Sequence, residues 1–327
     1  MSEAADPPHV AVTGAAGYIG SRLVADLTER HPDWTVTALD NFYLGDVERI
    51  GDVTVRDVDI RDRDALEETL AGADAVCHLA AISGVDDCEE HADRAYEVNV
   101  QGTDNVAWFC RKTGAAMLFP FSMAVLGDPH DFPITTDHPR DPLNWYGRTK
   151  YVSERAIEGF ADGAFPAIQF MIANLYGDHR IGDRRVSKGT VINFFVDRAL
   201  SGETLTVYEP GTQSRNFVHV TDVARAFRLG VERALERVAA GETGTWKYEI
   251  ASDEDPSVRG VADLVADAVE RETGERPPVE LVENPREGET LVGDFAVETT
   301  AAEEDLGWAP ERTVPESVAD LVARGLD

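Results

Sequence analysis

The chain has 327 residues, and its 61 acidic against 30 basic side chains give a formal net charge of −31. A surface of this charge repels nucleic acid and anionic lipid, so neither nucleic acid nor a membrane is expected as a partner. Hydrophobic residues make up 43% of the chain, which supports one large or two closely joined packed domains and excludes extensive disorder.

The sequence contains no pattern typical of export, membrane insertion or metal binding. The polar residues 1–8 lack the basic start and apolar run of a signal peptide, and the longest apolar stretch, residues 114–127, is too short to span a bilayer. We therefore expect a cytoplasmic protein. Three cysteines do not suggest a disulfide framework. Cys88 and His91 could form a pair of metal ligands, but no second cluster accompanies them, so we expect no metal.

Strand-like and helix-like segments alternate through the first half of the chain. In chain order we expect a strand at 9–13, a helix at 18–29, strands at 35–39 and 53–58, a helix at 65–70, a strand at 75–79, a long helix at 92–113, a strand at 116–121, a helix at 146–160 and a strand at 167–173. This alternation predicts a parallel, doubly wound sheet.

Beyond Gly177 the alternation stops. We expect a helix at 191–201 and a short strand at 204–207, whereas 217–236 and 246–250 return to the sheet. Residues 256–327 should contain two amphipathic helices and a few short strands. The predicted fold is α/β, with a doubly wound parallel Rossmann sheet (1–176 plus about 217–250) and a smaller, discontinuous C-terminal substrate domain (about 177–216 plus 251–327).

A glycine-rich turn joins the first expected strand to the first expected helix. Gly14, Gly17 and Gly20 permit a tight turn and a close backbone approach, and the N-terminus of the following helix attracts a pyrophosphate. Asp40 follows the second strand, where a carboxylate accepts hydrogen bonds from ribose hydroxyls and repels a 2′-phosphate. This arrangement indicates a dinucleotide site that prefers NAD to NADP.

A second motif carries candidate acid–base chemistry. Tyr146 and Lys150 lie one helical turn apart on the same face of the helix at 146–160. We expect the ammonium to lower the pKa of the phenol, so that a phenolate can take a proton from a hydroxyl group while hydride leaves the same carbon. Ser122 follows the fifth strand, where its hydroxyl could reach the same oxygen. These three residues are the candidate catalytic residues.

Further short motifs continue along nearly the whole chain. Together with the two above they occupy residues 12–20, 39–41, 59–62, 78–81, 99–103, 122, 146–150, 174–177, 215–222, 286–289 and 306–310. In this order they resemble the extended short-chain dehydrogenase/reductases, in particular the nucleotide-sugar epimerase/dehydratase family. The resemblance implies an NAD-dependent enzyme that acts on a nucleotide-diphosphate sugar.

The resemblance also implies which residues bind the two ligands. At the cofactor it places Gly14, Gly17, Tyr18, Ile19, Gly20, Asp40, Asn41, Asp59, Ile60, Leu79, Ala80, Ala81, Asn99, Tyr146 and Lys150. At the substrate it places Ser122, Asn174, Thr190, Val191, Arg215 and Arg286, with the two arginines and Asn174 on the diphosphate. Either Gly293 or Phe295 would limit the size of the sugar.

Departures from the family pattern narrow the expected reaction. The family's dehydratases carry an acid pair after the catalytic Ser or Thr, but Met123 and Ala124 cannot move a proton. The resemblance therefore favours epimerisation at C4 of a UDP-glucose/UDP-galactose type substrate through a 4-keto sugar. Met171, Leu126 and Asn216 replace a frequent Arg, Tyr and Asp of the family.

Two kinds of alternative stay open at this point. The first is another NAD-linked reaction on the same ligand class, such as decarboxylation of a nucleotide-linked uronic acid, reduction of a keto sugar or dehydration. The second is a dinucleotide-binding relative without catalytic activity. The family commonly pairs the helices that correspond to 92–113 and 146–160, and the first of these carries Val98, Val106, Trp108 and Phe109. We therefore expect a homodimer.

The charge pattern resembles that of cytosolic proteins from salt-loving microbes. The acidic residues are dispersed along the chain, and lysine occurs at four positions, which are Lys112, Lys150, Lys188 and Lys247. Dissolved salt screens the mutual repulsion of so many carboxylates. An acidic protein of ordinary habitat is the alternative interpretation.

Thermal melts across a potassium chloride series test this interpretation. We expect the melting temperature to rise towards molar salt, because screening relieves the self-repulsion of a chain with a net charge of −31. A melting temperature that stays level or falls across the series would refute the halophilic interpretation.

Overall fold

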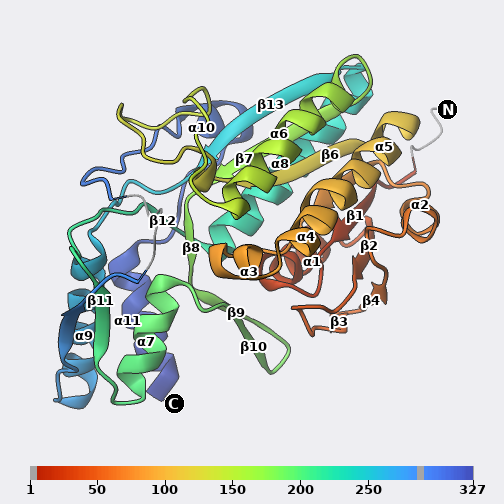
Figure 1. The fold of residues 1–327 in the computed structure, drawn as a ribbon. Coiled ribbons are helices and arrows are strands. Elements are labelled where there is room, and N and C mark those ends of the chain that lie inside the picture. The colour runs from red at the N-terminus through yellow and green to blue at the C-terminus, as the bar shows by residue number, and fades with distance from the viewer. Residues whose placement is uncertain (1–5, 286–290, 327) are drawn as a thin grey trace.

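The computed structural model describes residues 6–285 and 291–326. An eight-stranded sheet with the order β13-β7-β6-β5-β1-β2-β4-β3 forms its centre (Figure 1). Its strands are β1 (His9–Thr13), β2 (Thr35–Asp40), β3 (Arg49–Ile50), β4 (Val53–Asp57), β5 (Ala75–His78), β6 (Ala116–Ser122), β7 (Pro166–Ile172) and β13 (Gly244–Ile250). All neighbours pair in parallel except β3, which is antiparallel to β4. The prediction of a doubly wound parallel sheet is confirmed.

Helices cover both faces of this sheet. On one face α1 (Tyr18–Arg30) packs against α8 (Val220–Ala240), which also contacts β5, β6 and β7. On the other face lie α2 (Arg63–Leu70), α5 (Thr103–Thr113) and α6 (Trp145–Ala161). Since a sheet covered on both faces buries every side chain of its central strands, all of β7 is buried. Its sequence, which is apolar except for Gln169, follows from that position.

The long helix expected at 92–113 is not a single α-helix. It consists of α4 (Ala92–Tyr96), a π-helix (Glu97–Gly102) and α5, and a short helix α3 (Val85–Glu90) that the sequence analysis did not predict precedes it. In the π-helix the carbonyl oxygen of Asn99 accepts hydrogen bonds from the hydroxyls of Thr103 (2.6 Å) and Ser153 (2.7 Å). The wider turn frees this carbonyl for side-chain donors, which apolar periodicity alone does not reveal.

A second group of elements lies beside the carboxyl ends of the strands (Figure 1). It contains β8 (Asn174–Tyr176), β9 (Asp178–Ile181), β10 (Arg184–Ser187), α7 (Val191–Leu200), β11 (Leu205–Tyr208), β12 (Phe217–His219), α9 (Val258–Thr273), β14 (Val279–Val282) and α11 (Val314–Leu326), and α10 (Thr300–Leu306) packs on β13. The expected two helices after residue 256 are three in the described part of the chain. The β9–β10 hairpin was also not predicted, because its strands are mostly polar and β10 is largely exposed.

Two hydrophobic clusters form the core. The larger one lies within the sheet and its helices, and the smaller one joins α7, α9, α11 and β11. Phe295 and Trp308 pack with the larger cluster although they are close to the C-terminus. The division of the chain into two domains stays a prediction. Within the described residues, no helix is both long and apolar enough to cross a membrane.

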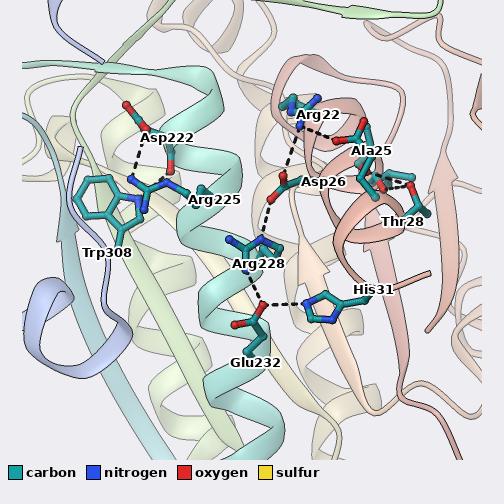
Figure 2. Close-up of polar contacts among 12 residues, drawn as sticks. Arg22, Ala25, Asp26, Thr28, His31, Asp222, Arg225, Arg228, Glu232 and Trp308 are labelled. Carbon is teal, nitrogen blue, oxygen red and sulfur yellow. Dashed lines mark hydrogen bonds and ion pairs between the residues drawn. The ribbon is translucent and has the colours of Figure 1, made fainter. Parts of the chain in front are cut away.

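Charged side chains join α1 to α8 (Figure 2). The Asp26 carboxylate accepts from Arg22 (3.4 Å) on its own helix and from Arg228 (2.9 Å) on α8. Arg228 also donates to Glu232 (2.6 Å), which contacts the ring of His31 (2.8 Å). The side chains of Asp26 and Arg228 are 13% and 14% exposed. Because this pair is shielded from water, removing one partner costs more stability than breaking a surface ion pair does.

Replacing Arg228 by Met tests the contribution of this network. We expect a loss of about 1–3 kcal/mol in the free energy of unfolding, because Asp26 would lose a cationic partner while remaining largely buried. Arg49→Met is the control, since the Arg49 side chain of the Arg49–Asp52 pair is 64% exposed and should matter by less than about 0.5 kcal/mol. Equal losses in the two variants, measured by urea unfolding, would contradict the assignment.

Candidate active site

The carboxyl ends of the parallel strands bring most of the predicted site residues to one edge of the sheet. The glycine loop follows β1, Asp40 ends β2, Asp59 follows β4, residues 79–81 follow β5 and Ser122 ends β6. Ligands of doubly wound folds bind along this edge. The side chains there are mostly half-buried, as expected for the lining of a crevice.

The glycine loop lies directly against the segment that follows β5. Gly14 has a φ of +69°, and a Cβ atom there would lie 2.5 Å from the backbone nitrogen of Ala80. A side chain at Gly20 would collide with the carbonyl oxygen of Gly14. Among the described residues no side chain caps α1, whose N-terminus follows Gly17. These features leave a bare backbone cradle at a helix N-terminus, which fits a dinucleotide pyrophosphate.

Asp40 is fixed at the border of this cradle. Its carboxylate accepts hydrogen bonds from the backbone nitrogens of Ala16 (3.1 Å) and Phe42 (2.8 Å). Burial raises the pKa of Asp40, while these backbone donors favour its charged form and oppose that rise. The carboxylate is therefore held in one orientation beside the loop, as the proposed ribose contact requires.

Other predicted cofactor residues make contacts within the protein. Asp59 accepts from Asn41 (3.1 Å) and from Arg61, whose guanidinium lowers the pKa of Asp59 to about 2. Ile60 is buried against Gly102, and half-buried Ile19 packs on the larger cluster. These contacts shape the wall that would face an adenine. Direct contact of these residues with the ligand stays a prediction.

Tyr18 and the end of β5 also have structural partners. The Tyr18 hydroxyl donates to the carbonyl oxygen of Gly177 (2.6 Å), and burial raises the pKa of this phenol. His78 contacts the hydroxyls of Thr13 (2.8 Å) and Thr103 (2.9 Å), and burial lowers the pKa of its imidazole to about 3. The neutral ring of His78 therefore ties β1, β5 and α5 together just before residues 79–81.

Asn99 holds the segment after β5 against the catalytic helix. Its amide accepts from the backbone nitrogen of Ile82 (2.8 Å) and donates to the carbonyl oxygen of Ile82 (3.0 Å) and the hydroxyl of Thr149 (3.2 Å). Asn99 is 2% exposed. Sequence reasoning placed this residue near the cofactor, and the structure gives it a positioning role between residue 82 and α6.

The catalytic candidates meet because α6 approaches the end of β6 closely. Asn144 caps α6 by accepting from the backbone nitrogen of Gly147 (2.9 Å). A Cβ atom at Gly147 would lie 2.5 Å from the carbonyl oxygen of Ala124, so glycine permits this approach. The Ser122 hydroxyl lies close enough to the Tyr146 phenol to lower the pKa of that phenol. Lys150 donates to the carbonyl oxygen of Pro120 (3.4 Å), so all three predicted side chains line the same place.

The electrostatics of the trio differ from the expectation. Burial raises the pKa of Tyr146 to about 12, although the nearby Ser122 hydroxyl opposes the shift. Burial is the main cause that lowers the pKa of Lys150 to about 8, and the nearby Lys188 ammonium acts in the same direction. The expected lowering of the phenol pKa by Lys150 is therefore wrong for the ligand-free protein. Desolvation penalises both charged forms and outweighs their mutual attraction.

The predicted substrate residues lie around β8, β12 and α7. Asn174 donates to the carbonyl oxygen of Asn216 (3.0 Å), and Arg215 donates to that of Ser214 (2.8 Å). Thr190 precedes α7, where Val191 is 36% exposed. Arg286 lies outside the described residues.

The structure also shows the surroundings of Asn216, a departure from the family pattern, and of the two candidate sugar gates. The Asn216 side chain donates to the carbonyl oxygen of Ser252 (2.6 Å) and accepts from its backbone nitrogen (3.0 Å). An aspartate could accept but could not make the first bond, which explains the amide. Of the two candidate sugar gates, Phe295 is buried in the core, whereas Gly293 is exposed with open space beside it. Which of the two positions limits the size of the sugar stays a prediction.

Sequence reasoning missed Lys188. Its ammonium donates to the hydroxyl of Ser83 (2.6 Å), four residues beyond Leu79. The signal available in the sequence was the rarity of lysine, which makes each of the four positions notable. In the described chain no three His, Cys, Asp or Glu side chains form a group that could hold a metal ion.

Comparison with known proteins places the chain among nucleotide-sugar enzymes. The model of the NAD dependent epimerase/dehydratase family matches residues 10–251. A UDP-glucose 4-epimerase of Corynebacterium glutamicum is 31% identical over 92% of this chain and 91% of its own. A UDP-N-acetyl-alpha-D-glucosaminuronate decarboxylase of Bacillus cytotoxicus is 31% identical over 77% of each chain. The Thermus thermophilus UDP-glucose 4-epimerase in complex with NAD has a TM-score of 0.81 at 25% identity, with 97% of this chain and 99% of that chain covered.

Lys150→Met should separate function from stability. Because burial lowers the pKa of Lys150 from 10.5 to about 8, its ammonium destabilises the ligand-free fold below pH 8, and this cost disappears as pH rises towards 10.5. We expect Lys150→Met to melt at or above the wild-type temperature at pH 7, with a difference that shrinks by pH 10, while NAD binding weakens. A variant that melts well below wild type at pH 7 would contradict this assignment.

Proposed function

The chain belongs to the NAD dependent epimerase/dehydratase family, which confirms NAD as the predicted cofactor, and we propose that it inverts C4 of a nucleotide-diphosphate sugar. The substrate pair is of the UDP-glucose and UDP-galactose type. The observation that carries the proposal is the proximity of the Ser122 hydroxyl to the Tyr146 phenol, with Lys150 one turn along α6. The relatives named as UDP-glucose 4-epimerases support the choice of substrate.

Bound at the glycine loop, NAD would supply a reversible acceptor for the hydride of C4. Tyr146 takes the proton of the C4 hydroxyl and later gives it back, and Ser122 keeps the sugar oxygen within its reach. The Lys150 ammonium adds positive charge beside the phenol, which favours the phenolate over the neutral phenol. Transfer of hydride to the opposite face of the keto sugar inverts C4 without net oxidation.

The residues after Ser122 argue against dehydration. Met123 is buried and Ala124 has no functional group, so neither can protonate a leaving hydroxyl. Both residues instead belong to a short 3-10 helix. The Ser122 hydroxyl caps it by accepting a hydrogen bond from the backbone nitrogen of Ala124 (3.2 Å). Decarboxylation of a nucleotide-linked uronic acid is the second candidate, because one relative of equal identity carries that name.

The proposed enzyme is a homodimer. Trp108 on α5 and Val152 on α6 are 41% and 44% exposed, and the two helices pack side by side on one face of the sheet. Burial of these side chains against a second copy would remove apolar surface from water.

Tyr146→Phe tests the mechanism. The change keeps the ring but removes the ionisable oxygen, so turnover should fall about a hundredfold or more while NAD and UDP binding persist. Tyr151→Phe on the same helix is the matched control and should retain activity. Rates are measured with purified nucleotide sugars, including glucose, galactose, N-acetylhexosamine and uronic acid forms, with products separated by chromatography.

Each outcome of this experiment decides something. Full activity of Tyr146→Phe on the identified substrate would overturn the mechanism. Carbon dioxide release from a nucleotide-linked uronic acid without epimerisation of any sugar would favour the decarboxylase. Binding of NAD and UDP with no turnover of any compound would favour a dinucleotide-binding relative without catalysis.

Ser122→Ala should lower turnover less than Tyr146→Phe does, since it removes a hydrogen bond but no proton carrier.

A further inference from the structure

The four lysines divide into two kinds. Lys112 pairs with Glu67, and Lys247 pairs with Glu154 at 2.5 Å. Within the described ranges, neither Lys150 nor Lys188 forms an ion pair with a carboxylate, although acidic residues outnumber basic ones by two to one. The two lysines without such a partner are both at the candidate active site.

Lys188 connects the two ligand regions. It precedes α7 and reaches back to Ser83, whose hydroxyl (2.6 Å) and carbonyl oxygen (3.4 Å) accept from its ammonium. Ser83 is three residues beyond Ala80, which lies against Gly14 of the glycine loop. On the other side, two residues from Lys188, the buried hydroxyl oxygen of Thr190 has no hydrogen-bond partner among the described residues.

The two neighbouring ammonium groups, Lys150 and Lys188, favour the binding of an anion. Lys188 is close enough to lower the pKa of Lys150, and burial lowers the pKa of Lys188 itself, which Asp87 and Cys88 oppose in part. Two ammonium groups in one partly desolvated place repel each other. A ligand with two negative charges would remove that cost, whereas a neutral ligand would not.

We propose that the Lys188 ammonium binds a diphosphate ester, either that of the dinucleotide or that of the nucleotide sugar. The proposal rests on the proposed function only for the names of these ligands. An ammonium has three donors, so contacts to Ser83 leave capacity for phosphate oxygens. The segment before α7 thereby reaches from the substrate side of the site to the loop after β5.

Calorimetric titration of Lys188→Met with NAD, UDP and inorganic pyrophosphate tests the proposal at one fixed salt concentration. We expect pyrophosphate and at least one of the two nucleotides to bind about tenfold or more weakly, the usual effect of losing a charge-assisted hydrogen bond. Loss for NAD alone assigns Lys188 to the dinucleotide diphosphate, and loss for UDP alone assigns it to the nucleotide sugar. Uridine and adenosine, which lack phosphate, should bind unchanged.

Matched variants separate binding from folding. Lys112→Met removes a lysine from a surface pair and should leave every affinity unchanged, and Lys188→Arg should restore part of the loss. Because Lys188 lowers the pKa of Lys150, Lys188→Met should also move the alkaline decline of NAD affinity to higher pH. Should Lys188→Met not fold, Lys188→Gln is titrated in its place.

Unchanged affinities for all three phosphate ligands in a folded variant would overturn the proposal. Equal weakening of uridine, adenosine and the phosphate ligands would overturn it as well, since that pattern indicates a distorted site. None of these titrations requires turnover. A protein that proves not to be an epimerase could therefore still support or refute the role of Lys188.

Discussion

The glycine loop and the segment after β5 approach so closely that residue 14 has no room for a side chain. This backbone contact fixes where the N-terminus of α1 points, and it brings Ala16 within hydrogen-bond distance of Asp40. The same segment continues through Ile82, which Asn99 holds, to Ser83, which Lys188 contacts. The segment after β5 thus helps to position three parts of the candidate site. It contacts the glycine loop directly, and through that loop it is linked to Asp40. Asn99, which binds Ile82, links the segment to Thr149 of α6.

Charge is distributed in two distinct ways in this protein. Away from the cleft, basic side chains pair with the abundant carboxylates and join elements distant in sequence, as Arg228 joins α8 to α1 and Arg237 (2.6 Å from Asp305) joins α8 to α10. At the candidate active site, Lys188 lies close enough to Lys150 to lower the pKa of the Lys150 ammonium. In a chain of net charge −31, the two lysines at the candidate site are thus set apart by having no carboxylate ion pair among the described residues.

The alternating pattern predicted the sheet well because buried parallel strands such as β7 are almost entirely apolar. The glycines and Asp40 were found because their spacing has a direct physical reason. Other features have no local signature. The π-helix around Asn99 and the contact of Lys188 with Ser83 depend on groups 17 and 105 residues away. The pKa direction of Tyr146 was wrong because sequence spacing reports a neighbouring charge but not the depth of burial.

The π-helix Glu97–Gly102 is equivalent to one residue inserted into a continuous α-helix. It shifts the helical phase of everything that follows, by about 100° relative to what precedes it. Removing one residue here would restore regular geometry and improve the local hydrogen bonding of the helix. The same deletion would rotate Asn99 away from Ile82 or turn the face of α5 away from α6. The irregular turn therefore sets the angular register between the cofactor side and the catalytic side of the cleft.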